Sequence, residues 1–159
     1  MSWAAVDPLD PLNVAYVGGV GKFRTLDSGE HWIPLRNRII FTAASGSTAV
    51  AFGSDEFTED RGETWQALGI HANALSKSEE TGLLFAARGG GGVYSGHPEQ
   101  WEYRGLSNQN IQSLAICEKQ LLAVSVEGRI FRARIAASSI APEGEMWLAT
   151  GQLECNRWE

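Results

Sequence analysis

The sequence predicts an all-β fold built from about four repeats of four short strands each. Four segments share one pattern along the 159 residues. Each has an apolar strand, a turn rich in glycine or acidic residues, a second strand with an aromatic residue, and a polar turn that ends in tryptophan. Repeats of this length made of short strands are typical of β-propeller-type blades, here in a small ring or an open arc closed by oligomerisation.

The spacing of the repeats defines the expected blades. The repeats span 13–35, 48–68, 83–104 and 121–148, and their tryptophans Trp32, Trp65, Trp101 and Trp147 are 33, 36 and 46 positions apart. The aromatic residues of the second strands are Phe23, Phe57, Tyr94 and Phe131. Apolar stretches at Trp3–Val6, Ile39–Ala44, Ala72–Leu75 and Ile111–Cys117 supply a further strand before each repeat. We therefore expect a single repeat domain over 1–159, with blades at about 1–36, 37–69, 70–106 and 107–150 and a closing strand or tail at 151–159.

Two of the polar turns share a stricter pattern, Ser/Thr-x-Asp-x-Gly-x-Thr/Ser-Trp. An aspartate can accept hydrogen bonds from turn amides, a glycine can take a positive φ, and a tryptophan can cover the blade edge. The second turn fits throughout, whereas the first departs from the pattern only at His31. The motif residues are Thr25, Asp27, Gly29 and Trp32 in the first turn, and Thr58, Asp60, Gly62, Thr64 and Trp65 in the second.

These turns resemble the Asp-box, or BNR, repeat of sialidase-like and photosystem II assembly factor-like propellers. The resemblance implies that the turns lie on the face away from the ligand site, so we interpret Asp27 and Asp60 as structural. A sialidase also needs an arginine triad, a tyrosine nucleophile with its glutamate, and an acid aspartate, and no motif here matches them. The nearest approach to the Phe-Arg-Ile-Pro signature of sialidases is the segment 131–134. We therefore expect a member of the non-enzymatic branch with no catalytic residues.

Other reactive side chains show no pattern of a metal or cofactor site. His31, His71 and His97 lie in different repeats without ligand spacing, so we expect neither a metal nor a cofactor. The glycine run after Arg88 lacks the lysine and helix of a phosphate loop and is interpreted as a hairpin turn. Cys117 and Cys155 are expected as two reduced thiols, with a single bond between them as the alternative.

Charge and hydropathy limit the partners and the compartment. With 13 basic and 19 acidic residues the chain has a net charge of -6, which argues against nucleic acid because binding phosphates needs a basic face. Neither a signal peptide nor a transmembrane segment is recognisable, so we expect no membrane insertion and favour the cytoplasm.

Blade topology indicates where a partner would bind. Loops that join strands 2 and 3 of a blade, and strand 4 to the next blade, line one face of a propeller. The candidate binding-face residues on these loops are Arg36, Arg38, Asp55, Glu56, His71, Asn73, Arg88, Arg104, Asn108 and Asn110. We expect a non-catalytic protein-binding or scaffold module that acts through this loop face or a blade edge, with a protein partner or a homo-oligomer. The alternative is a carbohydrate-binding, lectin-like protein or a sialidase-like glycoside hydrolase.

Overall fold

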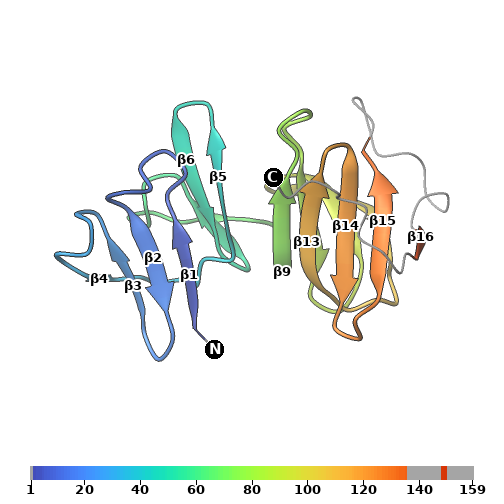
Figure 1. Cartoon of the computed structure of the whole chain (residues 1–159), viewed down its shortest axis with the longest axis horizontal. Coiled ribbons are helices and arrows are strands. Elements are labelled where there is room, and N and C mark those ends of the chain that lie inside the picture. Colours follow the sequence, from blue (N-terminus) through green and yellow to red (C-terminus); the bar gives the residue numbers. More distant parts are fainter. Residues whose placement is uncertain (1, 136–147, 150–159) are drawn as a thin grey trace, which may run out of the picture. The chain divides into compact units, whose positions relative to one another are not determined.

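The computed structural model describes residues 2–135 and 148–149, and within them every regular element is a β-strand. The strands form four sheets, and in each sheet four successive strands pair antiparallel in sequence order (Figure 1). This four-stranded meander is the topology of a propeller blade. The predicted class is therefore confirmed as an all-β, β-propeller-type repeat of four blades.

The four sheets are named blades 1 to 4 in chain order. Blade 1 contains β1 (Trp3–Val6), β2 (Ala15–Gly18), β3 (Lys22–Thr25) and β4 (Ile33–Pro34). Blade 2 contains β5 (Phe41–Ser45), β6 (Thr48–Phe52), β7 (Glu56–Thr58) and β8 (Gln66–Ala67). Blade 3 contains β9 (Ala72–Lys77), β10 (Leu84–Arg88), β11 (Val93–His97) and β12 (Gln100–Gly105). Blade 4 contains β13 (Ile111–Cys117), β14 (Gln120–Ser125), β15 (Ile130–Arg134) and β16 (Leu148–Ala149).

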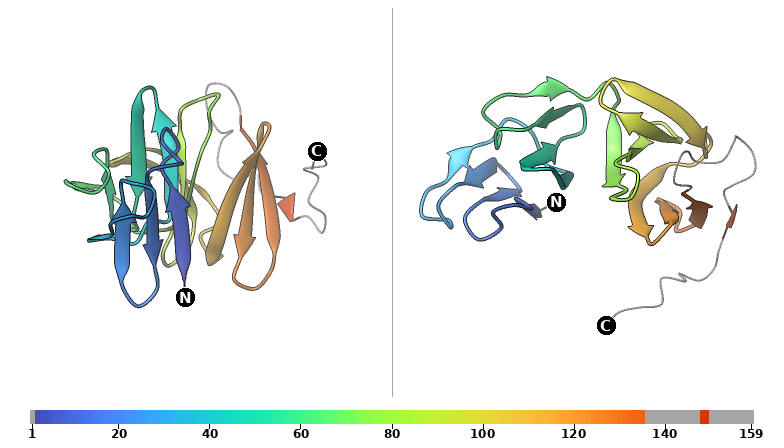
Figure 2. Two further views of the ribbon diagram at one scale, coloured as in Figure 1. Left: turned by 60° about the vertical axis from the view of Figure 1, so that its left-hand side comes forward. Right: turned by 90° about the horizontal axis from the view of Figure 1, so that it is seen from above.

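The blades are grouped in two compact units. Unit 1, Met1–His71, holds blades 1 and 2, and unit 2, Ala72–Glu159, holds blades 3 and 4. Within unit 1, β1 lies against β5, and within unit 2, β9 lies against β13, so the first strands of the two blades in a unit are neighbours. The two sheets of each unit can be followed in Figure 2.

In unit 1 the apolar core lies between the two sheets. Side chains alternate between the two faces of a strand, and in blade 1 the paired residues Ala5, Tyr16 and Arg24 all lie on the face toward blade 2. Tyr16 is only 2% exposed, and burial, followed by the nearby Asp7 carboxylate, raises its pKa to about 12. The buried residues of this core are Val14, Tyr16, Leu35, Ile39 and Ala51, with Trp3, Ala5 and Trp65 packed against them.

Unit 2 has its core between blades 3 and 4. Its hydrophobic residues come from both sheets, and consecutive residues are buried in the inner strands β10 and β14, so these two strands are covered on both faces. The buried residues of this core are Phe85, Ala87, Val93, Ile111, Leu114, Leu121, Ala123, Phe131 and Ile135.

Several details differ from the expectations or lie outside the described residues. Strand β5 begins at Phe41 rather than Ile39, because Ile39 and Ile40 belong to the connection from blade 1. Cys117 is disulfide-bonded, so the expected reduced thiol is wrong at this position. Cys155, Trp147 and the tail 151–159 lie outside the described residues. In the described part of the chain, no helix is long and apolar enough to cross a membrane.

Candidate functional site

The second Asp-box turn, between β7 and β8, is held by its own side chains. The Thr58 hydroxyl donates to Asp60 Oδ1 at 2.7 Å and accepts from Gly62 N at 2.8 Å. Asp60 in turn accepts from Thr64 N at 2.8 Å and from the Thr64 hydroxyl. These bonds, together with positive φ angles at the successive residues Arg61 and Gly62, make a compact loop. Asp60 is therefore already engaged inside the turn.

The first Asp-box turn, between β3 and β4, repeats this arrangement with one substitution. Thr25 Oγ1 donates to Asp27 Oδ1 at 2.8 Å and accepts from Gly29 N at 2.8 Å. Asp27 Oδ1 accepts from His31 N at 2.9 Å, and its Oδ2 lies 2.6 Å from His31 Nδ1. The imidazole thus occupies the place of the Thr64 hydroxyl, which explains how the turn keeps its form despite the mismatch in sequence.

The turn hydrogen bonds favour the ionised form of both aspartates. Bonds from the backbone and side chain of His31 and from Thr25 lower the pKa of Asp27 to about 2. Bonds from the side chain and backbone of Thr64 lower the pKa of Asp60 to about 2 as well. Donors that stabilise a carboxylate depress its pKa in this way.

Asp60→Asn should reduce the loss of stability in acid. A carboxyl whose pKa is lower in the folded than in the unfolded chain contributes stability above its ordinary pKa, 3.8 here, and that contribution is lost as the pH falls toward about 2. The thermal unfolding midpoint, measured from about pH 5 to pH 2, should therefore fall less in Asp60→Asn than in the wild type. Glu30→Gln, which removes an exposed charge from the equivalent turn, should keep the wild-type fall. Equal falls in all three proteins would contradict the structural role of Asp60.

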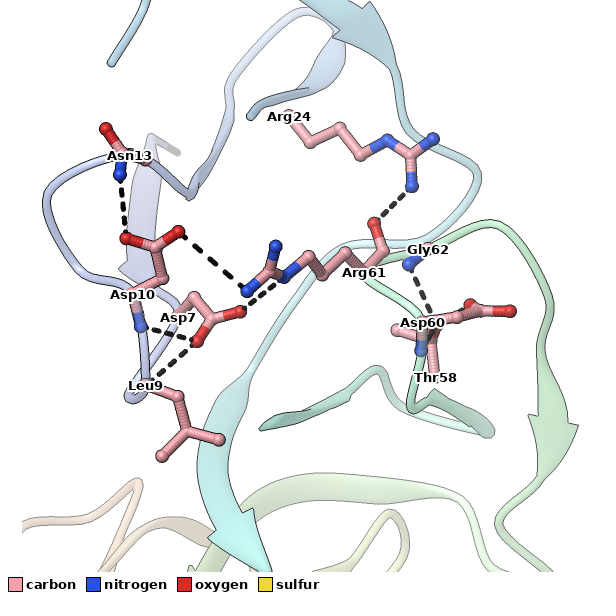
Figure 3. Close-up of polar contacts among 9 residues, drawn as sticks. All are labelled: Asp7, Leu9, Asp10, Asn13, Arg24, Thr58, Asp60, Arg61 and Gly62. Carbon is pink, nitrogen blue, oxygen red and sulfur yellow. Dashed lines mark hydrogen bonds and ion pairs between the residues drawn. The ribbon is translucent and has the colours of Figure 1, made fainter. Parts of the chain in front are cut away.

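The second Asp box also joins blade 2 to blade 1. Figure 3 shows Arg61, the residue between Asp60 and Gly62, reaching across to Asp7, with Arg61 Nε donating to Asp7 Oδ2 at 3.0 Å. Asp7 is 0% exposed, and its Oδ1 also accepts from the amides of Leu9 and Asp10 at 2.8 and 3.0 Å.

A second arginine makes the connection from the other side. Arg24 of β3 is 5% exposed and donates to the Arg61 carbonyl and to the Glu63 carboxylate. Each blade of unit 1 thus contributes an arginine to the other, and we call Asp7, Arg24, Arg61 and Glu63 the blade joint. No motif in the sequence indicates this group.

At the loop face of unit 1, the predicted residues form two small charged groups. Arg36 Nη2 donates to Glu56 Oε1 at 3.1 Å, and Asn37 Nδ2 donates to Glu56 Oε2 at 2.7 Å. His71 Nδ1 lies 2.7 Å from Asp55 Oδ1. Arg38 is exposed in the same connection as Arg36. The structure therefore brings together Arg36 with Glu56 and Asp55 with His71, so each of these acidic side chains has a partner within the unit.

In unit 2, two loops meet beside a pair of tyrosines. A Cβ atom on Gly91 would lie 2.3 Å from the Ser107 carbonyl oxygen, so the loops 89–92 and 106–110 are in close contact. The rings of Tyr94 and Tyr103 are 5.5 Å apart in an edge-on arrangement, and the Tyr103 hydroxyl accepts from Ser107 N at 3.1 Å. Arg88 covers the first ring, with its guanidinium carbon 5.9 Å from the Tyr94 centroid.

The exposed residues around these tyrosines define a small surface. Arg88 Nη1 donates to the Tyr94 hydroxyl at 3.3 Å. The Asn110 carbonyl accepts from Val126 N at 2.9 Å, and this bond links the loop 106–110 to the loop after β14 in blade 4. We call this surface the Arg88 cluster, made of Arg88, Tyr94, Tyr103, Asn108 and Asn110. The contact between the two tyrosines is not apparent from the sequence, in which Tyr94 stands out only as a strand aromatic.

Two predicted residues lie elsewhere in blade 3. Asn73 is the extra residue of a β-bulge between the pairs Arg88–Ala72 and Ala87–Ala74. Arg104 runs back along the sheet, where its Nε donates to Ser95 Oγ at 2.7 Å. With Trp101 it lines a hollow of about 590 Å³, whose other walls are Leu83, Ser95, Gly96, His97, Glu99, Gln100 and Glu102.

One group of potential metal ligands lies on the first Asp-box turn. Oxygen and nitrogen atoms of Asp27, Glu30 and His31 lie within 4.8 Å of one another. Asp27 is occupied by the turn amides and by His31, and the group is largely exposed. These bonds explain the cluster as part of the turn, and we assign no metal to it.

Comparison with known proteins places the chain among β-propeller structures. No family model matches the chain, and no curated protein does so. YCF48 from Cyanidioschyzon merolae is 16% identical with a TM-score of 0.54, over 86% of this chain and 55% of that one. "YCF48 bound to D1 peptide" is 18% identical with a TM-score of 0.52, over 82% and 49%.

Further solved structures have the same kind of fold with different roles. BBS1N in complex with ARL6DN is 14% identical with a TM-score of 0.55, over 88% of this chain and 52% of that one. The GH74 enzyme of Niastella koreensis is 12% identical with a TM-score of 0.55, over 87% and 23%. The chain thus spans about half the length of the YCF48 and BBS1N chains, and identities this low establish the fold alone.

Proposed function

We propose that this protein is a non-catalytic, protein-binding β-propeller module that acts within an assembly and contacts its partner through its loop face. The observation that carries the proposal is the Arg88 cluster. There an exposed arginine, two tyrosines in edge-on contact and two exposed asparagines gather where the loops 89–92 and 106–110 meet. The blade scaffold below holds these loops at fixed positions, as binding loops require.

The chemistry of the cluster suits a protein partner. Arginine and tyrosine are enriched among the residues that dominate protein interfaces, because they offer large rigid contact surfaces together with hydrogen bonds. Arg88 is exposed and, within the described residues, forms no ion pair. Its guanidinium therefore keeps donors for a partner. By contrast, Arg36 and His71 in unit 1 already face acidic neighbours at 3.1 and 2.7 Å.

Two of the similar structures support this class of function. One is YCF48 bound to a D1 peptide, and another is BBS1N in a complex with ARL6DN. Both are propeller-like chains that contact a protein or peptide. The D1 peptide and ARL6DN are the partners of those proteins. The similarity in fold supports protein binding as a class of function for this chain, and it does not indicate which partner the chain binds.

The proposal predicts that Arg88→Glu weakens partner binding without unfolding the protein. Tagged wild-type chain, Arg88→Glu and Arg134→Glu are used to capture proteins from an extract of the source cells, quantified by mass spectrometry. Arg134 is the matched control, since it is an exposed arginine in blade 4, at the end of β15 that lies away from the β14–β15 loop. Loss of an interface hot spot costs about 2 kcal/mol or more, so capture by Arg88→Glu should drop at least about tenfold. Equal capture by all three would contradict the proposal.

Carbohydrate binding is the second candidate, favoured by the hollow beside Arg104. Trp101 and polar side chains line it, and an aromatic ring with neighbouring hydrogen-bonding groups is an arrangement that sugars can use. A glycan array separates the two candidates. Glycan binding that is lost in Trp101→Ala but kept in Arg88→Glu would replace the protein-binding proposal. No glycan signal, with partner capture that depends on Arg88, would support it.

A further inference from the structure

Blade 1 presents an apolar sheet face that no part of unit 1 covers. Residues that pair across the strands of a sheet lie on the same face. On the face opposite the core, Val17 pairs with both Ala4 and Phe23, and Ala15 pairs with Val6. Val6, Phe23 and Trp32 are 48%, 39% and 45% exposed. We call this surface the back face, made of Ala4, Val6, Ala15, Val17, Phe23 and Trp32.

The equivalent face of blade 2 shows what such a surface binds. Ala51 lies on it and is 3% exposed, because it packs in the core that includes Tyr16 of blade 1. Trp65 of the second Asp box packs against the core that includes Leu35 and Ile39 of the preceding blade and its connection. A back face of this kind is thus covered by another blade within the same unit.

Trp32 is the counterpart of Trp65 and has the same orientation in its own turn. A Cβ atom on Gly29 would lie 3.6 Å from the Trp32 ring, and one on Gly62 would lie 3.7 Å from the Trp65 ring. The first tryptophan therefore points out of the back face as the second does, but toward a position that no blade of unit 1 occupies. Three large apolar side chains exposed on one sheet face mark an interaction surface.

We propose that the back face of blade 1 binds a blade of a second copy of this chain. The chain spans 55%, 49% and 52% of the YCF48 and BBS1N chains, so two copies supply about the chain length of those structures. A four-bladed ring is at the small limit of propellers, whereas a pair of copies doubles the number of blades.

Blade 4 offers a surface that fits this role. Leu122 pairs with Ala115 and Arg132, and Val124 pairs with Ser113 and Ile130, so these side chains share the face opposite the core of unit 2. Its accessible apolar side chains are the half-buried Val124 and Ile130, which lie beside Leu122, itself only 5% exposed. A contact between this face and the back face of another copy joins two different surfaces, and two such contacts related by a two-fold axis close the assembly.

Light scattering of the purified chain after size exclusion tests the proposal. The wild type should have twice the chain mass of 17.3 kDa. Phe23→Glu and Val6→Glu, which place a charge on the back face, should each have the mass of one chain. Val20→Glu, which makes the same kind of change at a fully exposed loop position of blade 1, should keep the doubled mass. A wild type that stays at the mass of one chain over a wide range of concentration would overturn the proposal.

Two further measurements separate loss of the contact from loss of the fold. Circular dichroism and the unfolding midpoint should show that at least one of the two back-face variants is folded at the mass of one chain, and a folded variant that keeps the doubled mass contradicts the proposal. Ile130→Glu on the proposed opposite surface should also halve the mass. Arg88→Glu should leave the mass unchanged, so failure of this proposal and failure of the protein-binding proposal are distinguishable.

Discussion

Gly62→Ala should destabilise the protein by about 3 kcal/mol, clearly more than Gly29→Ala at about 1–2 kcal/mol. The two glycines occupy the same position of the two Asp boxes, with φ of +95° and +90°. Alanine is strained at either position, because L residues with a Cβ rarely adopt this backbone conformation. The difference comes from packing. A Cβ on Gly62 would lie 2.8 Å from Leu35 Cδ1 and 3.2 Å from Arg24 Nη1, both in blade 1.

The same Cβ on Gly29 meets only the Trp32 ring, at an ordinary contact distance of 3.6 Å. Gly29→Ala therefore measures the backbone strain alone, and the excess in Gly62→Ala measures overpacking between the blades. Urea unfolding of both variants, followed by circular dichroism, gives the two free energies. Equal losses would show that blade 1 does not pack closely against the second turn.

The ion pair between Asp7 and Arg61 should have a larger coupling energy than the pair between Glu56 and Arg36. The atoms are almost equally far apart in the two pairs, at 3.0 and 3.1 Å. Asp7 is fully buried and holds two backbone amides as well, whereas Glu56 and Arg36 are partly or largely exposed. Removing one partner of a buried pair leaves an uncompensated group and costs about 3–5 kcal/mol, but an exposed pair contributes only about 0–1 kcal/mol.

Double-mutant cycles with alanine at each position isolate the two couplings. We expect about 1–3 kcal/mol for Asp7 with Arg61 and less than about 1 kcal/mol for Glu56 with Arg36. Asp7→Ala alone should be the most destabilising of the four single changes. Added salt should reduce the coupling of the exposed pair more than that of the buried one, because buried charges are screened less. Similar couplings in both cycles would mean that the blade joint contributes no more than a surface contact.

The repeats in the sequence predicted the fold well because blade structure is local. Strands, hairpins and Asp boxes lie within about 35 residues of one another, and each is defined by side-chain alternation and turn chemistry. One alignment in the sequence was misleading. Phe23 and Phe57 are the matching aromatics by position in the strand, but the equivalent threonines Thr25 and Thr58 show that Arg24 is the counterpart of Phe57. A shift of one residue moves a side chain to the opposite face of the sheet.

Contacts between loops and between blades were less predictable. Blade topology grouped Arg36, Glu56, Asp55 and His71 on one loop face but did not indicate which of them pair. Arg104, grouped with the same face, donates to Ser95 of its own sheet. Asp7 and Arg61 are 54 residues apart, and no motif connects them. Such pairs depend on how two sheets pack, which is a property that hydrophobic periodicity does not contain.

The blade joint also has a consequence for the order of the repeats. Ser28 and Arg61 occupy the same position of the two Asp boxes, yet Ser28 bonds to Leu12 and Asn13 of its own blade while Arg61 bonds to Asp7 of the blade before it. Blade 2 therefore carries a side chain, Arg61, whose partner Asp7 is supplied only by blade 1. Exchanging or permuting these two blades would keep both Asp boxes intact and still leave Asp7 buried without its arginine. The Asp-box motif gives the two blades the same turn, whereas Arg61 within the motif requires that blade 2 follow blade 1.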